Sequence, residues 1–229
     1  MNPLLRLKQI SKSFHQGTQR IEVLNRLDLT VQKGEIISIL GQSGSGKSTL
    51  LSLLAGLDHP ESGTVEVNGE DLAKLSQDQL SKFRSKNLGI VFQQYHLMSN
   101  LTAVENVGVP LELQGSRNFA EPARMALKQV GLSNRLAHFP SQLSGGECQR
   151  VALARAMVSE PDLILADEPS GNLDQKTGRE IMDLLFGLCR KREQSLILVT
   201  HNLDLAKSCD RTLLLADGRL KPMDSNVQV

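Results

Sequence analysis

One stretch of the sequence combines glycines, hydroxyl residues and a lysine at a spacing suited to binding phosphate. Residues 41–49 read GQSGSGKST and fit the pattern G-x-x-x-x-G-K-[ST], in which glycines let backbone N–H groups point at phosphate oxygens. Lys47 can reach the β- and γ-phosphates of a nucleotide, and Ser48 can bind Mg²⁺. The residues expected to bind the nucleotide are Gly41, Ser43, Gly44, Ser45, Gly46, Lys47, Ser48 and Thr49.

Two carboxylates end a second stretch, LILADE at 163–168. In an open parallel sheet, ligands bind at the carboxyl ends of the strands, which is also the edge where a phosphate-binding loop lies. Asp167 is suited to contact Mg²⁺ either directly or through one of its bound ligands, and Glu168 could orient and deprotonate the attacking water. His201 follows the strand-like run SLILVT, so we expect it at the same edge, where it would hold the γ-phosphate and the water in line.

A serine and two glycines, Ser144, Gly145 and Gly146, precede a helix-like segment within the run LSGGECQRVALARAM. Backbone N–H groups at a helix N-terminus form a site for anions. The sequence therefore predicts a second phosphate-binding surface in a chain that has one phosphate-binding loop.

The elements that must position these residues alternate between strands and helices. Apolar patterns predict strands at 4–10, 21–31, 35–40, 64–67, 88–92, 162–167, 195–200 and 211–216. Helices are expected after residue 47, from near 119 to 131, and from 175 to about 192. From about 76 to 158 the pattern is mostly helical, with capping boxes at Ser76/Gln79 and Thr102/Glu105. We therefore predict an α/β core split by a helical insert.

The composition narrows the function classes. Lys and Arg (26) nearly cancel Asp and Glu (25), so the net charge of +1 gives no electrostatic case for binding nucleic acid or anionic lipid. No apolar run reaches the ~18–20 residues that a membrane-spanning helix needs, and Arg6 and Lys8 lie where a signal peptide would be apolar. Cys148, Cys189 and Cys209 are too widely spaced for a disulfide framework or a zinc site. We expect a cytosolic protein with structural thiols.

Together the motifs give the whole chain a resemblance to the ATP-binding subunits of ABC transporters. GQSGSGKST resembles the Walker A loop of that family, LILADE its Walker B strand and LSGGE its signature motif. The resemblance implies a P-loop NTPase (RecA-like) ABC nucleotide-binding domain with an antiparallel β subdomain and a helical insert. It implies one ABC ATPase domain over 1–229, with an α/β ATP-binding core at 1–92 and 160–229 and a mainly helical subdomain carrying the signature motif at 93–159.

The same resemblance assigns three further positions. Gln93 resembles the Q-loop glutamine, which contacts Mg²⁺ and the water and links the site to the membrane subunit. Asp174 resembles the D-loop aspartate, which crosses the dimer interface. Phe14 lies where the family usually has a tyrosine that stacks on adenine, and it keeps the π-face without the hydroxyl. In this family two nucleotide domains pack head to tail and each signature loop closes on the other's ATP, which implies a homodimer in the ATP-bound state.

Longer segments narrow the resemblance. ADEPSGNLD and QQYHLMSNLTAVENVGVPL resemble the LolD/MacB/FtsE type, which serves lipoprotein release, macrolide export and cell division, and RLAHFPSQLSGGE and CDRTLLLADGRL are similar to its LolD/YbbA-like branch. Tyr95, Leu97, Met98 and Leu101 are expected to form an exposed groove for a short permease helix, with burial in the core as the alternative. Cys148 stands where the family usually has glutamine or arginine. Because a helix N-terminus lowers the pKa of a thiol, a redox switch is the alternative to a neutral replacement.

The resemblance implies an ATP-hydrolysing subunit that powers integral membrane permease subunits, for lipoprotein release or export, from the cytoplasmic face of the inner membrane. Soluble ABC ATPases of DNA repair carry a long coiled coil between the Walker A loop and the signature motif, but only 95 residues separate Lys47 from Leu143. The translation type carries two cassettes in one chain, so neither type fits. A cell-division-type ABC ATPase, which signals through a membrane partner without moving cargo, stays as the alternative.

Overall fold

The computed structural model describes residues 2–223. The chain divides into two compact units, unit 1 comprising residues 1–80 and 195–229 and unit 2 comprising residues 81–194. Each unit is described by itself below. The sequence predicted a different division, with a core at 1–92 and 160–229 and a helical subdomain at 93–159. That division is based on the roles of these segments in the resembled family and not on their packing, and it stays a prediction.

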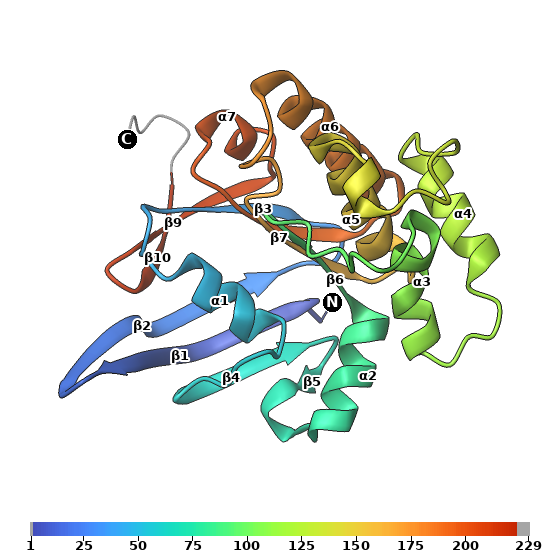
Figure 1. Ribbon diagram of the computed structural model, residues 1–229. Coiled ribbons are helices and arrows are strands. Elements are labelled where there is room, and N and C mark those ends of the chain that lie inside the picture. Colours follow the sequence, from blue (N-terminus) through green and yellow to red (C-terminus); the bar gives the residue numbers. More distant parts are fainter. Residues whose placement is uncertain (1, 224–229) are drawn as a thin grey trace. The chain divides into compact units, whose positions relative to one another are not determined.

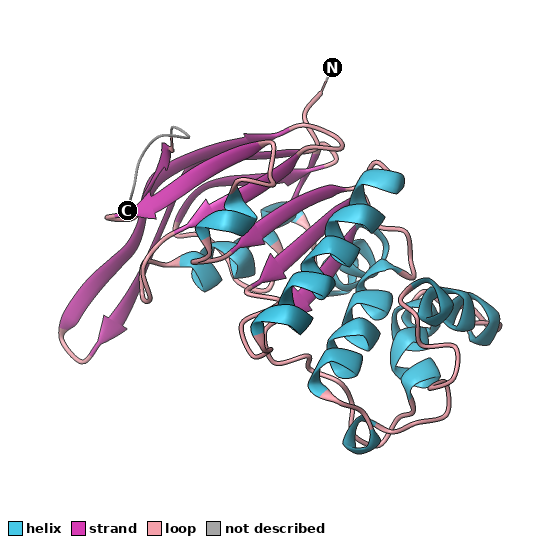
Figure 2. Cartoon of the chain, turned by 90° about the horizontal axis from the view of Figure 1, so that it is seen from above, coloured by secondary structure: helices cyan, strands magenta, loops and turns pink. Residues whose placement is uncertain are grey.

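Unit 1 contains a four-stranded antiparallel sheet in the order β2-β1-β4-β5. Its strands are β1 (Leu5–Gln16), β2 (Gln19–Val31), β4 (Ser62–Val67) and β5 (Glu70–Asp71). β1 and β2 form a long hairpin, blue in Figure 1 and the pair of magenta strands that reaches the left edge of Figure 2. This sheet confirms the expected antiparallel β subdomain.

The hairpin is longer than its sequence pattern predicted. A strand was expected over 4–10, but β1 continues to Gln16. Its pairing with β2 shifts register between Leu7 and Ser13, and Gln9 has a φ of +50°. Bulges of this kind interrupt the two-residue alternation of side chains, so the pattern ends before the strand does.

Unit 1 also contains strands in the order β10-β9-β3-β8. Their bounds are β3 (Ile36–Leu40), β8 (Ser195–Val199), β9 (Arg211–Ala216) and β10 (Arg219–Pro222). β3 pairs in parallel with β8 and β9, whereas β10 returns antiparallel to β9. All residues of β3 and β8 are buried, as expected for apolar runs covered on both faces. β10 was not predicted from the sequence, although Asp217-Gly218 is a hairpin-turn signal.

The helices beside these strands are short. α1 (Lys47–Leu54) follows β3 and α7 (Leu203–Ala206) follows β8, with a 3₁₀ turn η1 (Leu72–Lys74) after β5. α1 buries Leu50, Leu53 and Leu54. The short apolar helix predicted after Lys47 is thus confirmed.

Unit 2 combines a parallel strand pair with several helices. The strands are β6 (Leu88–Phe92) and β7 (Leu163–Asp167). The helices are α3 (Ala103–Leu113), α4 (Ala120–Gln129), α5 (Gly145–Met157) and α6 (Gln175–Lys191), with a 3₁₀ turn η2 (Pro140–Gln142), while α2 (Gln77–Asn87) begins in unit 1 and ends in unit 2. These bounds confirm the mostly helical region predicted over about 76–158. They also confirm the strand predicted within that region at 88–92, which is β6.

The packing of unit 2 follows its sequence periodicity. In α6 the apolar residues Ile181, Met182, Leu185 and Cys189 recur on one helical face, and all are buried. Thr102 caps α3 in a capping box with Glu105, as predicted. The Ser76/Gln79 pair is also confirmed, since Ser76 N–H donates to Gln79 Oε1 at 2.8 Å and Gln79 N–H donates to Ser76 Oγ at 3.3 Å.

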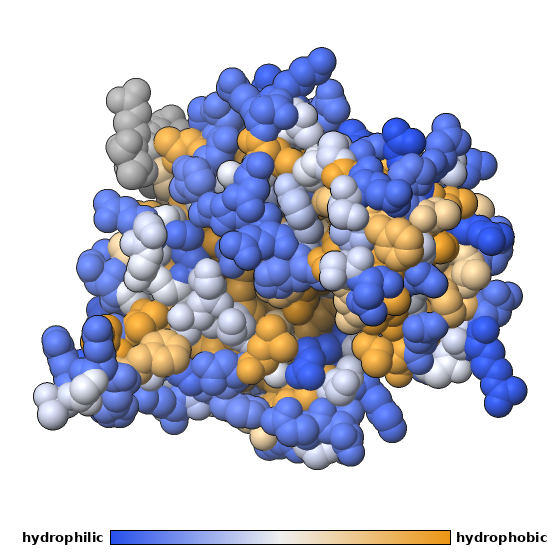
Figure 3. Space-filling model, viewed as in Figure 1, coloured by the Kyte–Doolittle hydropathy of each residue, from blue (hydrophilic) through white to orange (hydrophobic). Residues whose placement is uncertain are grey.

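Exposed apolar side chains are scattered. On the face drawn in Figure 3, orange patches lie between blue hydrophilic side chains. The groove expected from Tyr95, Leu97, Met98 and Leu101 is wrong in part, because only Met98 is exposed (47%) and the other three are half-buried. In the described part of the chain, no helix has the length and hydropathy needed to span a membrane.

Candidate functional site

The loop between β3 and α1 needs glycine at two positions. Gly46 precedes α1 with φ +99°, in the left-handed region, and a Cβ there would lie 2.8 Å from Val23 Cγ1. At Gly41 the backbone is crowded, because a Cβ would lie 2.5 Å from Ser45 Oγ and 2.8 Å from the Leu215 carbonyl oxygen. A side chain at either position would displace the loop, so the glycines of the motif fix its path.

The ammonium group of Lys47 lies inside this loop. Only 9% of the residue is exposed, and Nζ donates hydrogen bonds of 2.8 Å to the carbonyls of Gly41 and Gln42. An ammonium group has three N–H donors, and a buried charge is costly unless an opposite charge accompanies it. The third donor and the charge therefore fit an anionic ligand held by the loop.

Two further features of the loop supply hydrogen-bond donors. Ser45 Oγ is buried and has no hydrogen-bond partner among the described residues. α1 begins at Lys47 without a side-chain cap, which leaves its first-turn N–H groups to a ligand or to water. A buried hydroxyl and an uncapped helix N-terminus are donors that a phosphate group can use. The loop fits the polyphosphate expected from its sequence.

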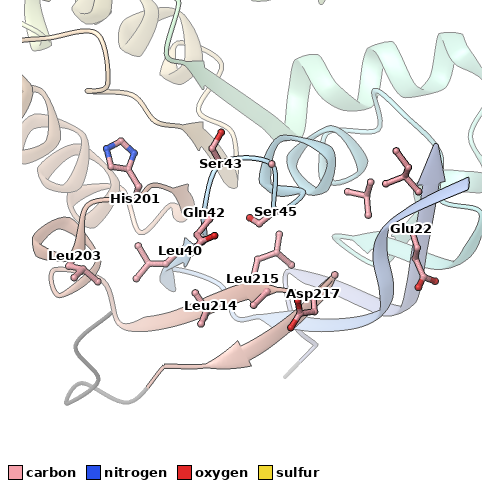
Figure 4. Close-up of a pocket in the computed structure, with 16 residues that line it drawn as sticks. Glu22, Leu40, Gln42, Ser43, Ser45, His201, Leu203, Leu214, Leu215 and Asp217 are labelled. Carbon is pink, nitrogen blue, oxygen red and sulfur yellow. The ribbon is translucent and has the colours of Figure 1, made fainter. Parts of the chain in front are cut away.

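A cavity of about 790 Å³ adjoins the loop. It is lined by Leu40–Ser45, by Ile21–Val23 of β2, by Leu214–Gly218 around the β9–β10 turn, and by His201 and Leu203. In Figure 4, Gln42, Ser43 and Ser45 lie between His201 on one side and Glu22 on the other. This volume is in the range of about 300–1,000 Å³ typical of small-molecule sites.

His201 reaches the cavity from the carboxyl end of β8. β8 pairs in parallel with β3, and Thr200 N–H donates to the Ile39 carbonyl at 3.2 Å. The residue after Thr200 therefore lies beside the start of the phosphate-binding loop. The structure brings His201 and Gly41–Ser45 to one cavity, as the sequence predicted, while the role of His201 stays a prediction.

Phe14 lies next to this cavity without lining it. It pairs with Ile21 across the β1–β2 hairpin, and directly opposed residues of antiparallel strands point to the same face. Ile21 lines the cavity, and both side chains are exposed, Phe14 at 45%. Lys12 Nζ lies 5.3 Å from the centre of the Phe14 ring. The ring thus presents an apolar face on the side where an adenine could stack.

In unit 2 the ends of β6 and β7 lie side by side. Phe92 pairs with Asp167, so Gln93 and Glu168 are the first residues beyond two paired strands. Gln93 Nε2 donates to Asn172 Oδ1 at 3.0 Å, and Asn172 Nδ2 donates to the Gln93 carbonyl at 3.0 Å. The sequence analysis did not identify Asn172 as a partner of Gln93, because the two are far apart in sequence.

Glu168 has an unusual backbone conformation. Its φ is +43°, in the left-handed region that non-glycine residues seldom adopt, and its carbonyl accepts a hydrogen bond from Gly171 N–H at 2.9 Å. Strained backbone of this kind persists where surrounding contacts hold it, and it is common at active sites. Other described residues, such as Gln9 and Glu193, share this conformation, so the role of Glu168 stays a prediction.

The signature segment is built around a capped helix. Ser144 is the N-cap of α5, with its Oγ accepting from Glu147 N–H at 3.3 Å while Ser144 N–H donates to Glu147 Oε2 at 2.8 Å. Arg135 Nε donates to Glu147 Oε1 at 2.8 Å. Arg135, followed by the backbone N–H of Ser144, lowers the pKa of Glu147 to about 2. The capping box was missed at the sequence level, although S-x-x-E is its usual signal.

This cap leaves part of the helix end available. The capping box uses the N–H groups of Ser144 and Glu147, so those of Gly145 and Gly146 are the first-turn donors left for an anion. The Ser144 Oγ accepts one hydrogen bond and can still donate its O–H. The predicted anion surface is therefore chemically possible at this helix end.

The two signature glycines also allow close packing inside unit 2. A Cβ at Gly146 would lie 2.6 Å from Thr177 Cγ2, and one at Gly145 would lie 3.4 Å from Leu173 Cδ2. Asp174, which was expected at a dimer interface, caps α6 by accepting from the N–H groups of Lys176 and Thr177 at 3.1 Å. Hydrogen bonds from Thr177, then from Lys176, lower the pKa of Asp174.

The predicted Mg²⁺ donors are all oxygen atoms. Mg²⁺ prefers oxygen ligands, and the hydroxyl of Ser48, the amide oxygen of Gln93 and the carboxylate of Asp167 meet that preference. Gln93 uses Nε2 for Asn172, so Oε1 is the atom suited to a cation. Among the described residues there is no group of three or more His, Cys, Asp or Glu side chains that could hold a metal.

The low thiol pKa on which a redox switch at Cys148 would depend is absent. Cys148 is 7% exposed, and burial, followed by the neighbouring charge of Glu147, raises the pKa of its thiol. Desolvation disfavours the thiolate more than the helix N-terminus favours it. A redox switch at this position has no support in its surroundings.

Comparisons with known proteins agree with these motifs. The family model described as "ABC transporter" matches residues 24–171, more than half of the chain. The lipoprotein-releasing system ATP-binding protein LolD of Geobacter metallireducens is 48% identical over 222 residues, which cover 96% of this chain and 99% of that protein. The uncharacterized ABC transporter ATP-binding protein YbbA of Escherichia coli is 47% identical over 220 residues, covering 95% and 96%.

Solved structures extend the similarity to the fold. The dimeric post-hydrolysis state of the ATP-binding cassette MJ0796 bound to ADP and Pi aligns with a TM-score of 0.89 and 38% identity, covering 98% of this chain and 100% of that one. A second dimeric structure of MJ0796, described as a bacterial ABC transporter cassette, gives the same TM-score at 39% identity.

Proposed function

The chain belongs to the ABC transporter family, as an ATP-binding and ATP-hydrolysing subunit, and we propose that it powers a membrane permease of the lipoprotein-release type. The observation that carries the proposal is the near full-length similarity to LolD proteins, combined with a phosphate-binding loop whose buried donors fit a nucleotide. Two copies would close on two ATP molecules, pull on the permease and reopen after hydrolysis.

Binding of ATP would begin at the loop of unit 1. Lys47 would turn from the Gly41 and Gln42 carbonyls to the β- and γ-phosphates, a charge-assisted contact stronger than the one it leaves. The hydroxyl of Ser45 and the first-turn N–H groups of α1 would donate to the same phosphates. Phe14 would stack on the adenine.

The reaction itself would depend on residues at the strand ends. Glu168 would accept a proton from the attacking water, and His201 would hold the γ-phosphate and that water in line. Ser48, Gln93 and Asp167 would hold Mg²⁺, which when bound neutralises charge on the transferred phosphate. Within unit 1, Ser48 lies in the first turn of α1 and His201 comes shortly after β8. Within unit 2, Asp167 ends β7, while Gln93 and Glu168 directly follow β6 and β7.

Closure of a dimer would use the signature segment. Ser144, Gly145 and Gly146 would donate to the γ-phosphate held by the partner, head to tail, and Asp174 would cross the interface. Two structures of MJ0796 are described as dimeric, which supports the formation of a dimer. In this proposal the chain is one ABC domain, with a core at 1–92 and 160–229 and a helical subdomain at 93–159, and it binds permease subunits at the cytoplasmic face of the inner membrane.

Light scattering tests the dimer step. Glu168→Gln protein mixed with ATP and Mg²⁺ should double in mass, because ATP stays bound when the base is missing. Adding Ser144→Arg to that variant should abolish the doubling. A persistent monomer, even with co-purified permease subunits, would overturn the assignment of the signature segment.

Co-purification tests the transport step. The tagged chain, expressed with a candidate permease of the lipoprotein-release type, should be recovered with it from membranes, and Glu168→Gln should stop release of a lipoprotein substrate from vesicles. Binding to the permease with ATP hydrolysis but without any release would favour a cell-division-type signalling role.

A further inference from the structure

A fully buried glutamine lies on the helix that follows the signature segment. Gln149 of α5 is 0% exposed, and its Nε2 donates to the Pro169 carbonyl at 2.7 Å and to the Phe92 carbonyl at 3.3 Å. Gln149 thus bridges two segments that are far apart in sequence.

The two carbonyls flank the proposed reacting groups. Phe92 immediately precedes Gln93, and Pro169 immediately follows Glu168. Phe92 also pairs with Asp167 at the ends of β6 and β7. One amide group therefore binds the backbone beside the proposed Mg²⁺ ligand and the backbone beside the proposed base.

This bridge needs a side chain that donates N–H groups to two carbonyl oxygens. Both partners are carbonyl oxygens, and a glutamine amide is a side-chain end group with two N–H donors. The Gln149 Oε1 is buried without a hydrogen-bond partner among the described residues, which is unfavourable for stability. The amide therefore carries a cost at Oε1 while it holds two backbone carbonyls beside the proposed reacting groups, and this placement points to a positioning role.

A second residue of α5 binds the segment that follows Gln93. Arg155 donates to the Tyr95 carbonyl at 2.8 Å and to the His96 carbonyl at 2.6 Å. Tyr95 and His96 both have left-handed φ angles, +42° and +47°, so this turn is strained and needs such contacts. α5 therefore holds the Q-loop backbone on both sides of Gln93.

We propose that Gln149 is a positioning residue that couples α5, whose N-terminus carries Ser144, to Gln93 and Glu168. An anion bound at the N-terminal end of α5 would thereby be connected, through this helix and Gln149, to the backbone beside Gln93 and Glu168. The inference rests on the proposed roles of Gln93, Glu168 and Ser144, and it adds a residue that touches neither nucleotide nor water.

The matched control is a second buried glutamine of unit 2. Gln194 is 5% exposed, its Nε2 donates to the Pro161 carbonyl at 2.6 Å, and its Oε1 also lacks a hydrogen-bond partner in the described part of the chain. Pro161 precedes the amino end of β7, away from the strand end that leads to Glu168. Gln149→Met and Gln194→Met therefore each remove one buried side-chain amide. The two amides bind proline carbonyls beyond opposite ends of β7.

Steady-state hydrolysis gives the first readout. Gln149→Met should lower kcat by about 100-fold and leave the KM for ATP within about threefold, because misplacing reacting groups affects the chemical step. Gln149→Asn, which keeps the amide on a shorter side chain, should have an intermediate kcat. Gln194→Met should keep the wild-type kcat. A wild-type kcat for Gln149→Met would overturn the proposal.

Hydrogen exchange gives a readout that does not depend on activity. Peptides covering residues 93–98 should exchange faster in Gln149→Met than in the wild type and in Gln194→Met. Unchanged exchange there would also overturn the proposal. If Gln149→Met does not fold, Gln149→Asn is compared with Gln194→Asn in the same two measurements.

Glu168→Gln distinguishes a failure of the proposed function from a failure of the positioning role of Gln149. If Glu168→Gln hydrolyses ATP at the wild-type rate, the proposed function of Glu168 fails, whatever Gln149 does. If Glu168→Gln is inactive while Gln149→Met has the wild-type kcat, only the positioning role of Gln149 fails.

Discussion

Gln93 and Asn172 exchange two hydrogen bonds of 3.0 Å, one from each side-chain amide, although 79 positions separate them in sequence. Asn172 therefore orients the Gln93 side chain and leaves Oε1 for a cation. A close fit supports this arrangement, since a Cβ at Gly171 would lie 2.8 Å from Gln93 Nε2. The segments that follow β6 and β7 are in direct contact through these two residues.

Asn172→Ala should lower kcat for ATP hydrolysis by about 10-fold, with ATP affinity nearly unchanged, because Gln93 loses its orienting partner and not its own amide. Steady-state kinetics and nucleotide titration measure the two quantities. Asn100→Ala, at an exposed position of the same unit, is the control and should behave as the wild type. A loss of affinity without a loss of kcat would contradict the orienting role.

Glu168→Gln should bind ATP as the wild type does but hydrolyse it about 10²–10⁴-fold more slowly, the usual contribution of a general base. Single-turnover hydrolysis and a binding titration separate the two effects. Glu193→Gln is a suitable control, because Glu193 also has a left-handed φ of +54° in unit 2 and is exposed. Equal rates for the two variants would remove Glu168 from the reaction.

Lys47→Met should weaken ATP binding by about 100-fold, since hydrogen bonds to charged groups contribute roughly 1.5–3 kcal/mol. The folded protein should tolerate the change, because the variant also removes the cost of a buried charge. Isothermal titration measures the affinity and thermal unfolding the stability. Lys8→Met, at an exposed lysine of β1, should change neither.

The thiols should react in the order of their exposure. Burial raises the pKa of Cys189 to about 12, and burial with the charge of Glu147 raises that of Cys148, so both should resist alkylation at neutral pH. Cys209 is half-buried and should react first. Mass spectrometry after timed iodoacetamide treatment gives the order. Rapid labelling of Cys148 would show that its surroundings open in solution.

The strands and helices were predictable where apolar periodicity was continuous. β3 and β8 match the runs at 35–40 and 195–200, because their complete burial leaves an uninterrupted apolar signal. β9 matches the run at 211–216, in which Leu213 and Leu215 are the buried residues. The second half of β1 was not predictable, because the bulge at Gln9 breaks the alternation of apolar and polar residues from which a strand is predicted.

The residues of the candidate site likewise fall into those that were predictable from the sequence and those that were not. Residues 41–49 and the run LILADE were found because their spacing in sequence is itself the signal. Asn172, Gln149 and Arg155 were not found, because their partners are backbone carbonyls and amides brought together only by folding. The raised thiol pKa of Cys148 was not predictable, because a helix position does not reveal how completely a side chain is buried.

The capping box at Ser144 should make part of the stability depend on pH. Arg135 and the backbone N–H of Ser144 lower the pKa of Glu147 from 4.5 to about 2, so its carboxylate stabilises the folded state. That contribution is complete above about pH 4.5 and is lost as the pH falls toward about 2, where the folded protein also binds the proton. The side chains of Arg135 and Glu147 are 44% and 26% exposed, so solvent screens their interaction. We therefore expect the Glu147 carboxylate to contribute about 1–2 kcal/mol to the free energy of unfolding, less than the full pKa shift corresponds to.

The measurement is urea unfolding of the wild type and of Glu147→Gln between about pH 7 and about pH 3. The wild type should be more stable at neutral pH, and the difference should shrink as the solution becomes acidic. Glu121→Gln removes an exposed carboxylate whose oxygen lies 3.9 Å from Arg124, and its stability should follow that of the wild type at each pH. A constant difference between wild type and Glu147→Gln across this range would mean that the charge of Glu147 does not stabilise the helix that carries the signature residues.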